Sequence, residues 1–175
     1  MSITAEMPVT IKDTSASITQ ALRDLSRKRV LVGIPSSNND RSDGSSFSNA
    51  ARAYVFEFGA PEIGMPARPS LIPGVAEALP EVKIALGAAA KAALAGDEDK
   101  VDANLTIAGT KANNSVIARI QSNIPPPLRP ATIARRRIRS KGSSYRRKAT
   151  KAADVVALID TGEWLRAHTF VVEKR

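Results

Sequence analysis

The sequence predicts an α+β fold in which a small antiparallel or mixed β-sheet packs with α-helices in a single domain, residues 1–175. Three observations lead to this expectation. Short apolar runs over 30–34 and 168–173 lie toward the two ends of the chain and can pair as strands. Between them, two long segments with helical periodicity flank a short polar turn, which predicts a long helical hairpin. A basic segment over 125–153 follows the hairpin and is expected to form an extended insert or arm.

The chain begins with a predicted helix over 14–29, in which apolar residues recur at helical spacing and which Thr14 or Ser15 can cap. The apolar run over 30–34 follows directly and is typical of a buried strand. Polar residues then fill 36–47, which we interpret as a mobile loop between two ordered elements.

A second helix is predicted over about 49–58, with Ser48 as its N-cap. We expect Ala50, Ala53, Tyr54 and Phe58 on its inner side. The helix ends before Gly59, where a turn rich in glycine and proline begins.

The first helix of the hairpin is rich in alanine, begins at Ser70 or Pro73, and extends to about Ala95. Gly74 and Gly87 lie inside this segment, and each disfavours a helix by up to about 1 kcal/mol relative to alanine. The helical pattern persists on both sides of the two glycines, so we predict one continuous helix.

The second helix of the hairpin covers about 100–122, after a polar turn over 96–100. Its apolar positions at helical spacing are Val101, Leu105, Ala108, Ala112, Val116, Ile117 and Ile120. Three consecutive prolines, 125–127, cannot continue it. A short helix over 163–167 and a closing strand over 169–172 complete the predicted domain, with the helices packed on one face of the sheet.

The formal net charge of +9 comes from one segment. Residues 129–151 contain ten basic side chains and no acidic one: Arg129, Arg135, Arg136, Arg137, Arg139, Lys141, Arg146, Arg147, Lys148 and Lys151. The other basic residues nearly balance the 17 acidic residues, so a near-neutral domain carries one basic insert. We favour docking of this insert on an acidic protein surface. Contact with nucleic-acid phosphates and a plain solvated linker stay open as alternatives.

Several functional classes are disfavoured by composition. The chain has no cysteine, which excludes disulfides, thiolate metal sites and a cysteine nucleophile. No apolar run approaches the roughly 18–20 residues of a membrane span, and the N-terminus lacks a signal-peptide pattern, so we expect a soluble protein without membrane contact. The single histidine, His168, is expected to be partly exposed at the start of a strand. No catalytic residue, metal site or cofactor is expected.

The triplet Asp160-Thr-Gly162 has the form found in aspartic proteases. That chemistry needs two carboxylates that share a proton, together with a flap and a further apolar layer. Only 13 residues follow Gly162, which is too few to build them. We therefore interpret Asp160 or Thr161 as the cap of the helix through Trp164. Trp164 itself is expected to be a core or interface anchor.

Residues 54–71 form the most restrained segment of the sequence. Phe56 and Phe58 flank Glu57, and prolines then recur through the turn that follows. Pro69 pushes the preceding residue, Arg68, toward extended geometry. We interpret this segment as a rigid joint that presents the guanidinium group of Arg68 to a carboxylate.

Several of these segments together resemble tail-completion or head–tail joining proteins of tailed bacteriophages and prophages. The resemblance rests on the order of five blocks: the apolar run 30–34, Phe56-Glu-Phe-Gly59, Met65-Pro-Ala-Arg-Pro69, the proline- and arginine-rich 126–137, and Leu158-Ile-Asp-Thr-Gly-Glu-Trp-Leu165. The chain departs from the family pattern at Ser70, where we would expect an aromatic residue. It departs again after Gly162, where Glu163 and Trp164 stand in place of the basic residue and leucine of the family pattern.

The resemblance implies a structural virion protein and not an enzyme. Proteins of this kind assemble as rings, typically of six copies, at the head-proximal end of the tail, where the ring ends tail-tube polymerisation or joins the tube to the head connector. The implied partners are further copies of the chain, the head-connector or adaptor protein and the tail-tube protein, with non-specific contact to packaged DNA in the lumen. The implied location is the virion neck, and the host cytoplasm during assembly.

Interface residues follow from this reading: Phe56, Glu57, Phe58, Arg68, Asp160, Thr161 and Trp164 form the expected subunit or partner interface, and the ten basic residues above form the expected arm. A heterologous ring needs two different complementary patches on each subunit, and these segments are candidates for them. The alternative is a basic nucleic-acid-binding protein that uses residues 129–151.

Overall fold

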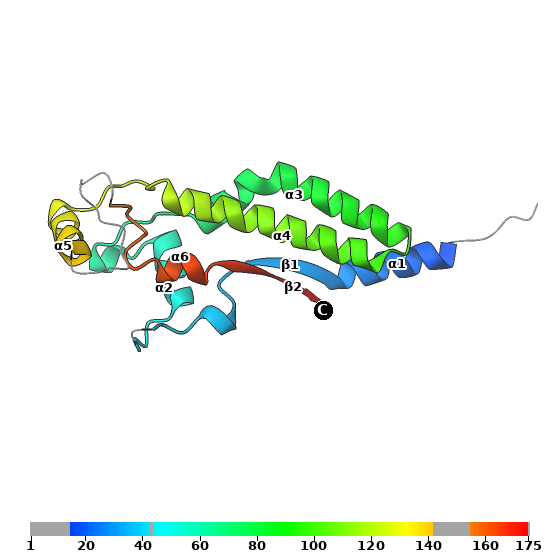
Figure 1. Cartoon of the computed structure of the whole chain (residues 1–175), viewed down its shortest axis with the longest axis horizontal. Coiled ribbons are helices and arrows are strands. Elements are labelled where there is room, and N and C mark those ends of the chain that lie inside the picture. The colour runs from blue at the N-terminus through cyan, green and yellow to red at the C-terminus, as the bar shows by residue number, and fades with distance from the viewer. Residues whose placement is uncertain (1–14, 43, 142–154, 175) are drawn as a thin grey trace, which may run out of the picture.

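The computed structural model describes residues 15–42, 44–141 and 155–174 (Figure 1). Its elements are α1 (Ser15–Arg27), β1 (Lys28–Gly33), the 3-10 turn η1 (Ser36–Asn38), α2 (Asn49–Phe58), the 3-10 turn η2 (Pro61–Ile63), α3 (Leu71–Leu94), α4 (Glu98–Gln121), α5 (Pro130–Lys141), α6 (Glu163–Ala167) and β2 (Thr169–Lys174). The predicted α+β class, the small antiparallel sheet and the long helical hairpin are confirmed. The hairpin runs along the strands, with α1 at one end of the molecule and α2, α5 and α6 at the other.

In the described residues the sheet consists of β1 and β2, which pair antiparallel with Val32 opposite Phe170 and Leu31 opposite Val171. One face packs on α4, while Leu31 and Val171 point away from it and are exposed. The strand predicted over 30–34 begins earlier, at Lys28. It is half-buried, whereas we expected it to be buried. The physical reason is that helices cover this sheet on one face only.

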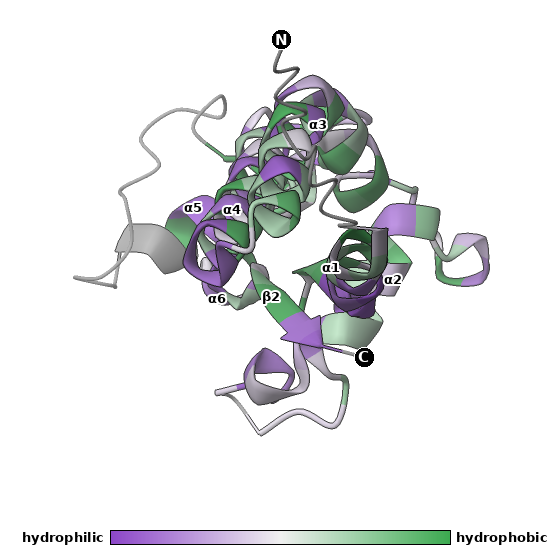
Figure 2. Ribbon diagram, turned by 90° about the vertical axis from the view of Figure 1, so that its right-hand side faces the viewer, coloured by the Kyte–Doolittle hydropathy of each residue, from purple (hydrophilic) through white to green (hydrophobic). Residues whose placement is uncertain are grey.

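The α3–α4 hairpin is packed through small residues. Ala85 and Ala89 of α3 are buried, and the predicted apolar positions of α4 are buried except Ile117, which is partly exposed. A Cβ at Gly74 would lie 2.8 Å from the Val116 Cα, so this glycine allows the two helices to approach closely. Gly109 of α4 similarly faces the Phe170 ring of β2. The hairpin is shown in Figure 2 with hydrophobic stretches along α3.

Two apolar clusters form the core of the part of the chain that the structure describes. Near the turn of the hairpin, Ala89, Val101 and Leu105 pack with Leu25 of α1 and Val30 of β1. At the other end, the cluster contains Val116, Ile120, Ile124, Leu158 and Trp164. Lys28 links the start of β1 to α4, since its Nζ lies 2.7 Å from a Glu98 oxygen and 2.6 Å from an Asp102 oxygen.

Helix α2 confirms the predicted cap but not the predicted inner face. The Ser48 hydroxyl accepts a hydrogen bond from the Ala51 amide at 3.2 Å. Tyr54 and Phe58 are 65% and 57% exposed, and Ala50 is also exposed. Of the four residues predicted to face inward, Ala53 alone packs on the core. The buried face instead follows Asn49, Ala53, Phe56 and Glu57, because the turn after the helix brings the start of α3 against that side.

Three further predictions, on the basic segment, the cap of α6 and the exposure of His168, differ from the structure. The first part of the basic segment, expected to be extended, is helical as α5, while residues 142–154 lie outside the described residues. The N-cap position of α6 is Gly162, where we predicted Asp160 or Thr161. The Thr161 hydroxyl does accept a hydrogen bond from the Glu163 amide at 3.3 Å. His168, expected to be partly exposed, is only 4% exposed because it packs edge-on against Trp164.

The polar loop over 36–47 contains η1 and is linked to α2 by the buried Asn49 side chain, whose amide donates to the carbonyls of Asn38 and Asp40. None of the helices that the structure describes is long and apolar enough to cross a lipid bilayer.

Candidate functional site

Glu57 stabilises the start of α3. Its carboxylate accepts three backbone hydrogen bonds, from Ser70 at 2.7 Å and from Leu71 and Ile72 at 2.9 Å each. The first amides of a helix have no partner within the helix, and a negative charge there interacts favourably with the helix dipole. Glu57 was predicted as an interface residue, but it is buried and caps a helix of its own chain. Nothing in the sequence pattern marks this role, because Glu57 and Ser70 lie in different elements.

Arg68 is buried, with 6% of its surface exposed. Its Nε and Nη2 donate to the Pro126 carbonyl at 3.0 and 2.7 Å. The prediction that Arg68 presents its guanidinium to a carboxylate is therefore wrong for this chain by itself: its hydrogen-bond acceptor is a neutral carbonyl. Burial lowers the pKa of Arg68 from its ordinary value.

Phe56 and Trp164 belong to the core of this end of the molecule. Their rings meet edge-on with centroids 5.0 Å apart. Trp164 is buried, so of its two predicted roles the core role is the one that the structure shows. His168 Nδ1 lies 3.0 Å from the Trp164 carbonyl. Burial lowers the pKa of His168, while the contact with Trp164 and the charge of Glu57 act in the opposite direction.

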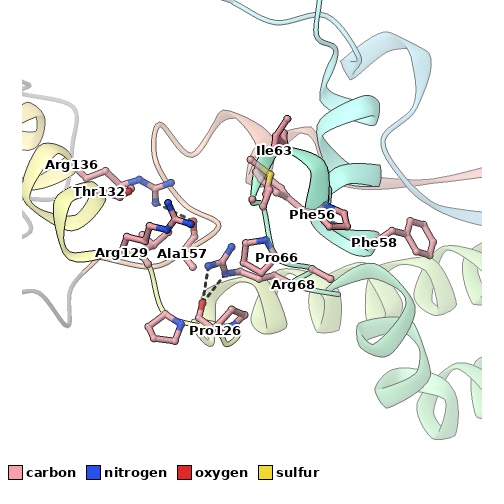
Figure 3. A pocket seen from close by; sticks show the side chains of 17 residues that line it. Phe56, Phe58, Ile63, Pro66, Arg68, Pro126, Arg129, Thr132, Arg136 and Ala157 are labelled. Atoms are coloured by element: carbon pink, nitrogen blue, oxygen red, sulfur yellow. Dashed lines mark hydrogen bonds between the residues drawn. The ribbon is translucent and has the colours of Figure 1, made fainter.

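A cleft of about 730 Å³ lies beside these residues, and we call it the joint cleft (Figure 3). Its lining includes Phe56 and Phe58 of α2, Ile63, Met65 and Arg68 of the following turn, Pro126 and Pro127, and Arg129 and Arg136 of the basic segment. The structure thus brings together two groups that the sequence analysis treated separately: the restrained joint and the first part of the basic arm.

Arg136 holds α5 against residues 156–159, which follow the undescribed residues 142–154 in the chain. Its Nη1 donates to the carbonyls of Val156 and Ala157 at 3.0 Å each and to that of Ile159 at 3.3 Å. This predicted arm residue is therefore also a structural link. Sequence reasoning missed the lining role of Ile63, Met65 and Pro126. For Met65 and Pro126 the available signal was their presence in the same motif blocks as Arg68 and Arg129, and Ile63 lies in the restrained segment 54–71.

The remaining predicted residues lie elsewhere. Asp160 and Thr161 are exposed and line a separate cavity of about 300 Å³ with Arg41, Arg52 and Glu163. Arg135 is exposed on α5, and Arg137 lies partly buried on the same helix. The side chains of Arg139 and Lys141, and all of Arg146, Arg147, Lys148 and Lys151, lie outside the part of the chain whose side chains are described.

The arrangement suits binding through apolar contact and charge. No group of three or more histidine, cysteine, aspartate or glutamate side chains that could hold a metal ion occurs in the residues described. Comparisons of the chain with protein-family models, curated proteins and solved structures found no match.

Proposed function

We propose that this chain is a structural subunit of a tailed-phage neck, a tail-completion protein that forms a ring at the head-proximal end of the tail and joins the tail to the head connector. The observation that carries the proposal is that the subunit exposes large apolar side chains on two separate surfaces. Such surfaces are expected on a chain that buries them by assembly.

The first surface is a stripe along one flank of α3. Ile72, Leu79 and Leu86 are all exposed and recur every seven residues, which places them in a row on a helix. Tyr54 and Phe58, whose ring centroids lie 4.8 Å apart, adjoin the stripe near Ile72. A row of this kind is suited to packing against a helix or strand of a neighbouring subunit.

The second surface is the uncovered face of the sheet. Leu31 and Val171 lie opposite each other in the strand register and are both exposed. In the described residues each strand has one hydrogen-bonded neighbour, so each also has an outer edge that a strand from another subunit can extend. The sheet surface and the α3 stripe are different in kind, which is what a head-to-tail ring requires of its two contacting patches.

Light scattering coupled to size-exclusion chromatography, at about 50 mM and about 500 mM salt, tests the proposal, with negative-stain imaging of the eluted protein. We expect a closed ring that persists at the higher salt, because apolar contacts are insensitive to screening. Leu79→Asp should dissociate it. Ile84→Asp, on the opposite flank of α3, is the matched control and should leave it assembled.

The alternative, a basic nucleic-acid-binding protein, makes the opposite prediction. A monomer at both salts that binds duplex DNA with an affinity falling steeply between them would overturn the ring proposal in favour of this alternative. The exposed Arg135 of α5 would then be one of the expected phosphate contacts.

A further inference from the structure

The joint cleft is lined by three basic side chains, Arg68, Arg129 and Arg136, and by no acidic one. The hydrogen bonds of Arg68 go to the Pro126 carbonyl, which satisfies two donors without neutralising the charge. Within the described parts of the chain, neither Arg68 nor Arg129 forms an ion pair with a carboxylate.

The two arginines differ in availability. Arg68 is buried and held in place, whereas Arg129 is exposed just before α5. Figure 3 shows the guanidinium groups of Arg68 and Arg129 on the α5 side of the cleft, with Phe56 and Ile63 on the other side. A carboxylate that enters the cleft can therefore meet a fixed cation and an adjustable one. Arginine is well suited to this because its planar fork can bind a carboxylate through two parallel hydrogen bonds.

The opposite side of the cleft is apolar. Ile63, at 70% exposed, and Met65 project from the turn after α2. Pro66, Pro126 and Pro127 also line the cleft, and a proline has no backbone N–H to offer. An occupant therefore finds few main-chain donors for strand addition on these walls and is held through its side chains.

We propose that the joint cleft is a docking site for an acidic, apolar segment of a partner protein, with a carboxylate of that segment bound by Arg129 beside Arg68 and an apolar side chain against Ile63 and Met65. This inference does not depend on the proposed ring function, because the cleft is complete within one subunit.

The charge of the lining selects this occupant over two others. Residues 142–154 of the same chain contain four basic residues and one acidic residue, so their charge has the same sign as the cleft. A nucleic-acid backbone would match the charge but would leave the apolar side facing a hydrated phosphate chain. An acidic and apolar peptide matches both sides.

Fluorescence anisotropy of the full chain with short labelled peptides tests the proposal. The probe is a peptide of alternating aspartate and leucine. One reference peptide replaces each aspartate by asparagine, another replaces each leucine by serine, and a labelled thymidine oligonucleotide represents nucleic acid. We expect saturable binding of the probe and binding weakened by about tenfold or more for either reference peptide, since each loses one half of the recognition.

Two pairs of variants locate the binding. Arg129→Gln should weaken binding of the probe peptide by about tenfold. Arg135→Gln, on the adjoining helix, removes the same charge outside the cleft and should change the affinity little. Ile63→Ser should weaken binding of the probe peptide severalfold. Ile84→Ser removes an isoleucine of similar exposure on α3, 75% against 70%, and should leave the affinity unchanged. These four side chains are exposed, so the variants are expected to fold.

Three results would overturn the inference. The first is absence of saturable binding by the aspartate–leucine peptide. The second is equal binding by the asparagine peptide or equal weakening by the two arginine variants. The third is preferential binding of the oligonucleotide with the same dependence on Arg129, which would assign the cleft to nucleic acid.

Discussion

The α3–α4 hairpin is held by close packing of small apolar residues, whereas around α2 and the joint cleft, at the opposite end of the molecule, a few buried polar groups link segments in addition to the apolar core. Ala85, Ala89 and Gly74 allow the hairpin helices to approach. Glu57 and Arg68 instead link segments through hydrogen bonds to backbone groups. Packing is distributed over many residues, so single changes are partly absorbed. A polar link depends on one side chain, and its loss leaves buried partners unsatisfied.

The largest effect is expected from Glu57→Ala. The change leaves the amides of Ser70, Leu71 and Ile72 without their acceptor at the start of α3. We expect a loss of about 3 kcal/mol or more in the free energy of unfolding, measured by urea denaturation. Glu62→Ala, an exposed glutamate in η2, is the control and should change stability little. A loss below about 1 kcal/mol for Glu57→Ala would show that water replaces the cap.

Gly74→Ala is expected to have the next largest effect. Its Cβ would lie 2.8 Å from the Val116 backbone, so α3 and α4 must separate at a loss of about 1–3 kcal/mol. Gly87→Ala, in the same helix with open space around it, should stabilise by up to about 1 kcal/mol. Thermal unfolding of the two variants compares them directly. Equal shifts in the same direction would contradict the close approach at Gly74.

Arg68→Gln tests the polar end at a second point. The variant loses the paired hydrogen bonds to the Pro126 carbonyl, and we expect a loss of about 1–2 kcal/mol in the free energy of unfolding. Hydrogen exchange should become faster at the backbone amides of residues 65 and 68, in the turn that carries the substitution, with little change in the hairpin. Uniform loss of protection over the whole chain would mean that the two ends do not unfold separately.

The smallest effect concerns pH. Burial lowers the pKa of His168, so the folded protein favours the neutral imidazole more than the unfolded chain does. The corresponding stability is present above the unfolded pKa of about 6.5 and is lost as the pH falls from there toward the folded value. Urea midpoints between about pH 7.5 and about pH 5 should decline in the wild type and decline less in His168→Gln. Parallel declines in both proteins would assign the pH dependence to other groups.

Much of the hairpin end could be predicted from the sequence. The apolar positions of α4 follow from periodicity, which involves residues within a few positions of each other. At the other end, the start of α2 at Ser48 follows from capping, which is equally local. The pairing of β1 with β2 was also predicted, because the sequence indicates two strands and each can pair only with the other. The inner face of α2 was predicted wrongly, since Glu57 is buried by a hydrogen-bonding role that hydrophobicity does not encode.

The sequence by itself determined the hairpin helices, the shorter helices other than α5 and the two strands, that a restrained turn follows Phe58, and that positive charge is concentrated in 129–151. Only the tertiary structure decided that Arg68 meets a carbonyl 58 residues away, that His168 is buried, and that Arg129 joins the restrained turn in one cleft. The physical reason is range. Periodicity, caps and prolines act within one or two turns of the chain, whereas the partner of a buried charge is chosen by packing between elements that are distant in sequence.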